Sequence, residues 1–113
     1  LRRGLTVASV QYRLTRDGYN GTDSVADVVD GFRFLRAHAG ELGIDPSRIV
    51  IVSESAGGHV AVMASLLLQP GLVKAVVGLW GIQDLILGLP KMGRVLRDGL
   101  LRHPGDRGRL LPQ

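Results

Sequence analysis

Short apolar runs alternate with longer helical stretches along most of this 113-residue chain. Runs rich in β-branched residues at Leu5–Val10, Ile49–Val52 and Val73–Trp80 predict three strands. Between them, Asp23–Leu42 has apolar positions three and four residues apart and predicts an amphipathic helix, while Ala56–Gln69 is nearly all small and apolar and predicts a second. This alternation favours parallel strands joined by right-handed crossovers. We therefore expect an α/β protein with a three-layer α/β/α parallel sheet.

The first predicted helix has one continuous apolar face and recognisable ends. Asp23 or Ser24 is the expected N-cap, and Asp27 favours the early turns. Gly43 is the expected C′ residue, and Gly31 in the interior weakens the helix unless a neighbouring backbone approaches there. The apolar face consists of Val25, Val28, Val29, Phe32, Leu35, Ala39 and Leu42.

The segments between these elements are rich in turn-forming residues. A polar loop at Thr15–Thr22 precedes the first helix, and Asp45-Pro46-Ser47 predicts a turn before the second strand. The run at Ile49–Val52 is apolar without interruption, which is typical of a strand buried on both faces. Pro70-Gly71 is expected to end the second helix.

The pattern weakens after Gly81, and this divides the chain. We expect residues 1–85 to form the central part of the α/β domain and residues 86–113 to be a partial cap, lid or irregular basic tail. Pro90–His103 could form a helix interrupted by glycines. Six Lys and Arg residues lie between Lys91 and Arg109, but no aromatic residue stands among them for base stacking. A solvated surface segment is therefore favoured over a nucleic-acid partner.

Composition excludes several classes of protein. The absence of cysteine excludes disulfides and thiolate metal sites. No apolar run is long enough for a membrane span, and no leader opens the chain, so we expect a cytoplasmic protein. No His, Asp or Glu cluster has metal-ligand spacing, and no cofactor is expected. Both ends resemble cuts, which favours a piece of a longer protein.

The most informative segment is Ile49–Ala61, with the sequence IVIVSESAGGHVA. A predicted strand passes directly into a predicted helix at Ser55, which is the context of a nucleophile elbow. A sharp turn there would expose the Ser55 hydroxyl at the carboxyl end of the sheet, where a base could take its proton. The backbone N–H of Ala56, at the helix N-terminus, could then stabilise an oxyanion. Gly57 and Gly58 would let strand and helix pack closely at the bend.

With these residues the chain resembles the esterase and lipase branch of the α/β-hydrolases, the branch of hormone-sensitive-lipase-like and bacterial acetyl- or feruloyl-esterase-like enzymes. The matching motifs are Tyr12-Arg13-Leu14, Leu42-Gly43-Ile44-Asp45-Pro46 and Glu54-Ser55-Ala56-Gly57-Gly58-His59. The resemblance implies a partial α/β-hydrolase fold, with Ser55 as nucleophile and the Ala56 amide as one oxyanion donor. It also implies a small-molecule ester as the substrate.

Three departures from the family pattern stand out. Ser53 replaces a glycine of the family two residues before the nucleophile, so we expect local backbone strain of roughly 1–3 kcal/mol there. The HGGG-type oxyanion loop would precede residues 1–11, which do not contain it. The catalytic acid and base follow the nucleophile in the order Ser, Asp or Glu, His, and are expected beyond this chain.

Other polar and aromatic residues have structural interpretations beside the catalytic ones. His59 belongs to the helix start and is not the expected base, while Glu54 is expected to orient the elbow or contact substrate. Asp84 and His103 stand in the right order for acid and base, but a cap for Asp84 and a surface position for His103 are favoured. Trp80 is expected to be buried against the helices or to line a pocket wall. The residues expected in loops and caps are Asp17, Asp23 and Asp27.

Three hypotheses of function follow. The first is a serine hydrolase of carboxylic esters working through a Ser55 acyl-enzyme, with a prolyl-oligopeptidase-like peptidase as a variant of the same chemistry. The second is a truncated or pseudo-enzyme chain without catalysis, which would be marginally stable because its strand edges are exposed. The third is nucleotide binding at Ser55-Ala56-Gly57-Gly58, which lacks the G-x-G-x-x-G spacing. The oligomeric state is left open.

Overall fold

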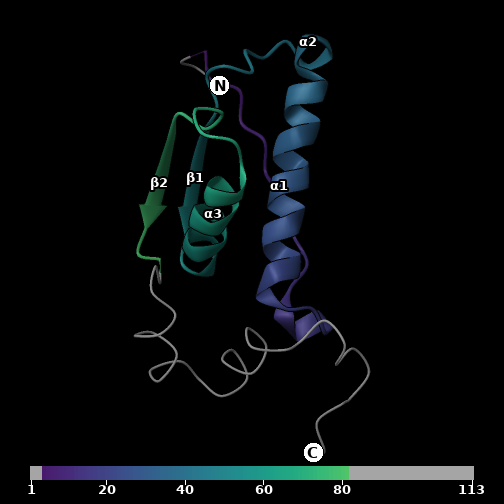
Figure 1. The fold of residues 1–113 in the computed structure, drawn as a ribbon, viewed down its shortest axis with the longest axis vertical. Helices are drawn as coiled ribbons and strands as arrows, with labels where there is room; N and C mark the ends of the chain where they lie inside the picture. The colour runs from purple at the N-terminus through teal and green to yellow at the C-terminus, as the bar shows by residue number, and fades with distance from the viewer. Residues whose placement is uncertain (1–3, 82–113) are drawn as a thin grey trace, which may run out of the picture.

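The computed structural model describes residues 4–81, so the predicted cap or tail at 86–113 and the Pro90–His103 helix lie outside the described residues. Figure 1 shows the elements in chain order along the described part. They are the 3-10 turn η1 (Thr15–Asp17), α1 (Gly21–Ala37), α2 (Ala39–Leu42), β1 (Val50–Glu54), α3 (Ala56–Leu67) and β2 (Ala75–Leu79).

The two strands form a parallel sheet, which confirms the α/β class and a partial α/β-hydrolase fold. Val50 pairs with Ala75 and Glu54 with Leu79, in register along the whole length of β1 and β2. Helix α3 connects the strands and covers one face of the sheet, and α1 packs beside α3 (Figure 1). Both strands end on the side of the molecule where α3 begins. The described residues therefore provide one helical layer and the sheet.

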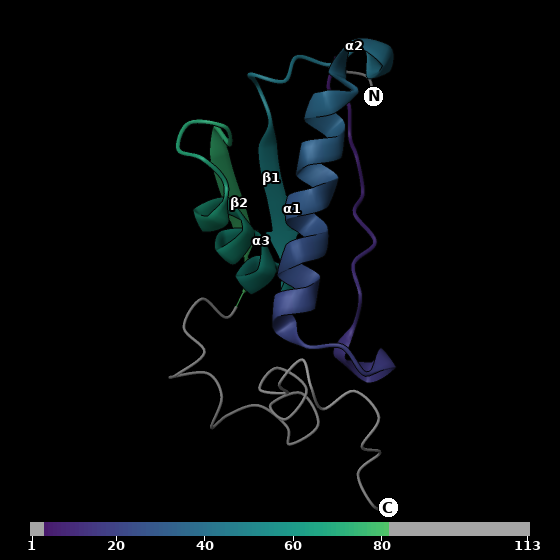
Figure 2. The ribbon, with the colours of Figure 1, turned by 45° about the vertical axis from the view of Figure 1, so that its right-hand side comes forward.

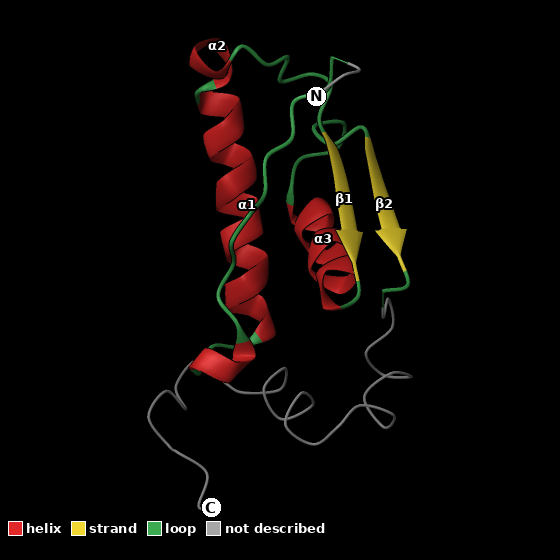
Figure 3. Cartoon of the chain, turned by 180° about the vertical axis from the view of Figure 1, so that it is seen from behind, coloured by secondary structure: helices red, strands yellow, loops and turns green. Residues whose placement is uncertain are grey.

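The other face of this sheet carries no helix from the described part. Seen from behind, the two strands are uncovered (Figure 3), and the alternate residues Val50 and Val52 are 48% and 68% exposed. The expectation that Ile49–Val52 is buried on both faces is therefore wrong for the described residues. The burial alternates along β1 because α3 covers only one of its faces.

The core lies between α1 and α3. It consists of Val25, Val29 and Phe32 from α1, Val60 and Ala64 from α3, and Leu68. Ala64 is completely buried, and such a small side chain lets the two helices approach closely. The predicted apolar face of α1 is thus confirmed at its centre, where Val25, Val29 and Phe32 are each less than 10% exposed.

Helix α1 begins earlier than the sequence predicts because Asn20 caps it. The Asn20 side chain accepts a hydrogen bond from the Asp23 backbone N–H at 2.9 Å, and the Asp23 carboxylate accepts one from the Asn20 N–H at 3.0 Å. This reciprocal capping box satisfies two N–H groups that the helix leaves without partners. The prediction of Asp23 or Ser24 as N-cap is therefore wrong. Ser24 instead donates to the backbone carbonyl of Arg13.

The C-terminal end of the predicted helix is interrupted at His38. Its backbone leaves helical geometry, with φ −104° and ψ 16°, and separates α1 from the single turn α2. The change of direction leaves Leu42 46% exposed, so its predicted place on the buried face is wrong. Gly43 adopts the left-handed conformation with φ 63°, which confirms it as the residue that ends the helix.

The predicted strand at Leu5–Val10 is not a strand in this structure. The segment runs alongside α1 (Figures 2 and 3), and Leu5 and Val7 are 68% and 70% exposed. A β-branched run becomes a strand only when a neighbour pairs with its N–H and C=O groups, and no described strand lies beside it. The close approach at Gly31 comes from the Val10 side chain, whose Cγ2 would lie 3.4 Å from a Cβ on that glycine.

The connection into β1 is the predicted turn. The Asp45 carboxylate accepts hydrogen bonds from the Ser47 N–H at 2.9 Å and the Ser47 hydroxyl at 2.6 Å. The Arg48 backbone N–H returns to the Asp45 carbonyl at 3.1 Å, which closes the turn. Hydrogen bonds to the Asp45 carboxylate from the Ser47 hydroxyl, the Ser47 N–H and the Arg48 side chain lower the pKa of Asp45.

Candidate active site

The bend between β1 and α3 has the geometry of a nucleophile elbow. Glu54 is the last residue of β1, Ala56 is the first of α3, and only Ser55 lies between them. Ser55 has φ 51° and ψ −128°, a conformation that L residues rarely adopt. Its backbone N–H donates to the Leu79 carbonyl at 3.1 Å, so the bend is fastened to the end of the neighbouring strand. Ser55 itself is exposed.

Ser53 does not show the strain expected from its place in the family pattern. It lies within β1, paired with Gly78, and it is not among the non-glycine residues with positive φ. Its hydroxyl is 3.5 Å from the Val77 carbonyl and the residue is half-buried. The expectation is wrong because the left-handed conformation of the turn is concentrated in Ser55, which leaves residue 53 in ordinary extended geometry.

The amide of Ala56 lies at the exposed N-terminus of a twelve-residue helix. The first N–H groups of a helix have no intrahelical acceptor, and the Ala56 N–H has none among the described residues. The Gly58 N–H is occupied, because it donates to the Ser55 carbonyl at 3.0 Å. A free N–H beside the serine, at the positive end of the helix dipole, is chemically suited to hold a developing negative charge.

Tyr12 borders the first turn of α3. Its hydroxyl would lie 3.6 Å from a Cβ on Gly57, which is an ordinary van der Waals separation. The neighbour of Gly57 is therefore this tyrosine rather than the strand that the sequence suggested. Tyr12 belongs to the Tyr12-Arg13-Leu14 motif, for which sequence analysis predicted no role. The motif could be recognised from the sequence, but its contact with the first turn of α3 could not.

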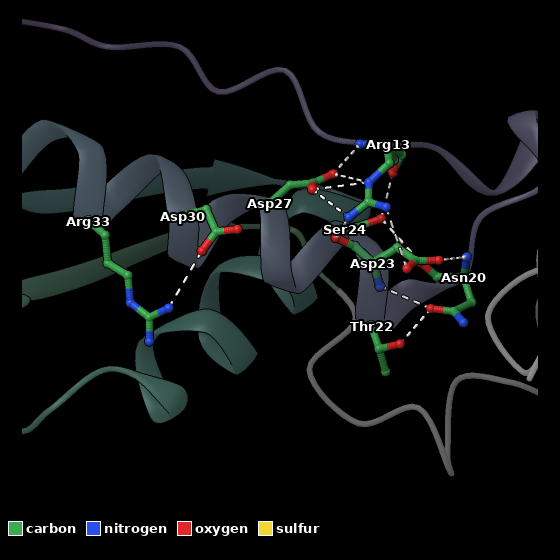
Figure 4. A network of polar contacts seen from close by, with 8 residues as sticks. All are labelled: Arg13, Asn20, Thr22, Asp23, Ser24, Asp27, Asp30 and Arg33. Atoms are coloured by element: carbon green, nitrogen blue, oxygen red, sulfur yellow. Dashed lines mark hydrogen bonds and ion pairs between the residues drawn. The ribbon is translucent and has the colours of Figure 1, made fainter. Parts of the chain in front are cut away.

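Arg13 fixes this segment to α1 through Asp27 (Figure 4). Its Nε lies 2.9 and 3.0 Å from the two carboxylate oxygens, its Nη2 donates at 2.7 Å, and its backbone N–H donates at 2.9 Å. The hydrogen bonds from the Arg13 side chain hold the pKa of Asp27 below its usual value and raise the pKa of Arg13. The role predicted for Asp27, a loop or cap residue, is wrong because its carboxylate binds this guanidinium instead.

The remaining candidate residues lie at different positions relative to Ser55, and not all of them are described. Glu54 is exposed directly before it, and Trp80 follows the strand end to which Ser55 is bonded. Trp80 is 76% exposed, so the expectation that it is buried against the helices is wrong. The Nδ1 atom of His59 is buried without a hydrogen-bond partner in the described part of the chain. Asp84 and His103 lie outside the described residues.

Further observations on residues 4–81 concern metal sites, membrane-spanning helices and cavities. No group of three or more His, Asp or Glu side chains there could hold a metal ion, and no helix there is both long and apolar enough to cross a membrane. A hollow of about 470 Å³ opens between Arg33 and Arg36 of α1 and Leu67 and Leu72 near the end of α3. It does not include Ser55, which stands open at the other end of α3.

Comparison with known proteins finds esterases and a lipase among the relatives of this chain. The chain is 39% identical over 64 residues to the probable isoprenylcysteine alpha-carbonyl methylesterase of Oryza sativa, covering 57% of the chain and 15% of that protein. It is 39% identical over 69 residues to an arylesterase of Saccharolobus solfataricus, with 61% and 22% covered. It is 35% identical over 77 residues to lipase 2 of a Moraxella species, with 68% and 17% covered. No solved structure matches the chain.

The chain thus spans less than a quarter of the length of each of these relatives. The match to a family model is much more complete, because the family described as BD-FAE covers residues 1–92. That range includes all of the described helices and strands and the Ser55 bend. The chain belongs to the BD-FAE family of α/β-hydrolase esterases.

Proposed function

We propose that this chain carries the nucleophile of a serine hydrolase of carboxylic esters. Ser55 Oγ attacks the ester carbonyl carbon, the alcohol leaves, and water then releases the acid from the Ser55 acyl-enzyme. The observation that carries the proposal is the exposed serine with φ 51° and ψ −128° between β1 and α3. The three relatives named above support it, since their names describe a methylesterase, an arylesterase and a lipase.

The Ala56 N–H is the proposed oxyanion donor. As the carbonyl carbon becomes tetrahedral its oxygen gains negative charge, and a fixed N–H at a helix N-terminus stabilises that charge more than it stabilises the neutral ester. A second donor, and the acid and base of the triad, are assigned to no residue of 4–81. In this proposal, parts of the protein outside the described residues supply them.

Covalent labelling tests the proposal directly. The chain, and the longer protein translated with its genomic flanks, would each be treated with a fluorophosphonate probe and assayed on p-nitrophenyl acetate. Ser55→Ala should abolish labelling and turnover in the longer protein. Ser53→Ala is the matched control, because it removes a hydroxyl two residues away without touching the bend, and should retain both. The absence of labelling in both forms would instead support the non-catalytic alternative.

A further inference from the structure

The hollow between α1 and the carboxyl end of α3 combines apolar side chains with two arginines. Two buried residues, Phe32 and Leu68, line it and are 4% and 7% exposed. Leu67 also lines it and is 64% exposed. Arg33 and Arg36 border the same space from positions three residues apart on α1, so they are neighbours on one helix face. Its volume of about 470 Å³ lies within the range of small-molecule sites.

The positive charge of these arginines is only partly neutralised within the described residues. Arg33 lies 3.5 Å from the Asp30 carboxylate (Figure 4), but the two side chains are 69% and 74% exposed, and such exposed pairs contribute little. Arg36 is in no ion pair within residues 4–81. The backbone carbonyls of Phe34 and Arg36 accept from the His38 N–H, so the end of α1 is capped by its own backbone. The guanidinium groups are therefore available to an anion.

We propose that this hollow is a binding site for an alkyl carboxylate, an amphiphilic molecule with one negative charge. Its chain lies against Phe32, Leu67 and Leu68, where each CH₂ group removed from water adds to the affinity. Its carboxylate accepts hydrogen bonds from Arg36 and Arg33, because the planar guanidinium group matches the geometry of a carboxylate. The partial negative charges at the ends of the two helices weaken the positive potential, so the expected affinity is modest.

The site is separate from the proposed nucleophile. Helix α3 has 12 residues, so its two ends are about 18 Å apart. Ser55 directly precedes the first residue of α3, whereas Leu67 is its last. Binding in the hollow is therefore independent of Ser55, and the inference does not rest on the proposed function.

A titration series tests both parts of the ligand. The longer protein with its genomic flanks would be titrated with hexanoate, octanoate and decanoate, and the methyl resonances of Leu67 and Leu68 would be followed by NMR. Affinity should rise roughly two- to fourfold for each added CH₂ group. Octanoate should bind more tightly than 1-octanol or octyltrimethylammonium, which lack the negative charge. Equal affinity for all three, or methyl resonances that do not move with octanoate, would overturn the proposal.

Substitutions assign the binding to this hollow. Arg36→Gln should weaken octanoate binding roughly 1.5- to 5-fold, the range for one exposed charge contact, and adding Arg33→Gln should weaken it further. Arg16→Gln is the matched control, because it removes an arginine side chain that is 79% exposed on η1, and it should change nothing. Ser55→Ala should bind octanoate as the native protein does. Equal losses in Arg36→Gln and Arg16→Gln, or a loss in Ser55→Ala, would show that the carboxylate binds elsewhere and would refute the site.

Discussion

The strain at Ser55 predicts that glycine stabilises the bend. The backbone of residue 55 has φ 51° and ψ −128°, which a residue with a Cβ atom adopts only with strain. Ser and Ala both have this atom, whereas Gly has none. Holding a non-glycine residue there costs on the order of 1–3 kcal/mol. Glycine also lowers the free energy of unfolding by roughly 0.4–1 kcal/mol, because its unfolded chain has greater conformational freedom. Ser55→Gly should therefore exceed Ser55→Ala in free energy of unfolding by roughly 0.5–2 kcal/mol.

Urea denaturation of the two variants measures this difference. With a slope of about 1–3 kcal/mol per M for small proteins, a difference of about 1 kcal/mol moves the midpoint by roughly 0.3–1 M. Both variants lack the hydroxyl, so the comparison is independent of catalysis and of any hydrogen bond that the serine makes. Equal midpoints, or a less stable glycine variant, would show that residue 55 is not held in the strained conformation and would refute the elbow.

Three other substitutions test the frame that positions the bend. Asn20→Ala should lower the free energy of unfolding by about 1 kcal/mol, because it removes the side-chain acceptor of the capping box. Asn20→Asp should retain that acceptor and the stability, and thermal melting measures both variants. Phe32→Ala should lower the free energy of unfolding by roughly 3–5 kcal/mol, because the ring is 4% exposed between α1 and α3. Phe34 is 55% exposed on the same helix, so Phe34→Ala should lower it by less than about 1 kcal/mol. Urea midpoints compare the two variants. Since its pKa is lowered in the folded state, Asp27 contributes stability that is complete above about pH 4 and is lost as the pH falls through its folded-state pKa. The difference in free energy of unfolding between the native chain and Asp27→Asn should therefore be smaller at about pH 3 than at about pH 6, and a constant difference would contradict the Arg13 pairing.

The sequence predicted the elements whose signals are local. The two helices and the turn at Asp45 follow from periodicity and turn chemistry, which act over a few residues, while the parallel pairing follows from the alternation of predicted strands and helices. The position of Ser55 between a strand and a helix could also be predicted, because the motif and its flanking elements are contiguous in the sequence. Helix boundaries were less predictable. Asn20 rather than Asp23 caps α1, because both residue types can act as an N-cap and only the reciprocal contact between them decides which does.

Three features that depend on particular distant contacts were not predicted. Leu5–Val10 has the composition of a strand, but composition does not supply a neighbouring strand to pair with it. The pairing of Arg13 with Asp27 joins residues fourteen positions apart on different elements, and no periodicity signals it. The left-handed backbone of Trp80 follows a strand whose end only the fold locates. In each case the missing information is which segments meet in space.

Identification of the labelled residue tests the central claim most directly. The longer protein with its genomic flanks would be reacted with a fluorophosphonate probe, digested, and the modified peptide located by mass spectrometry. The elbow predicts a single adduct on Ser55, absent from Ser55→Ala and unchanged in Ser53→Ala. An adduct on any other serine, or none on a protein that still hydrolyses p-nitrophenyl acetate, would contradict Ser55 as the nucleophile.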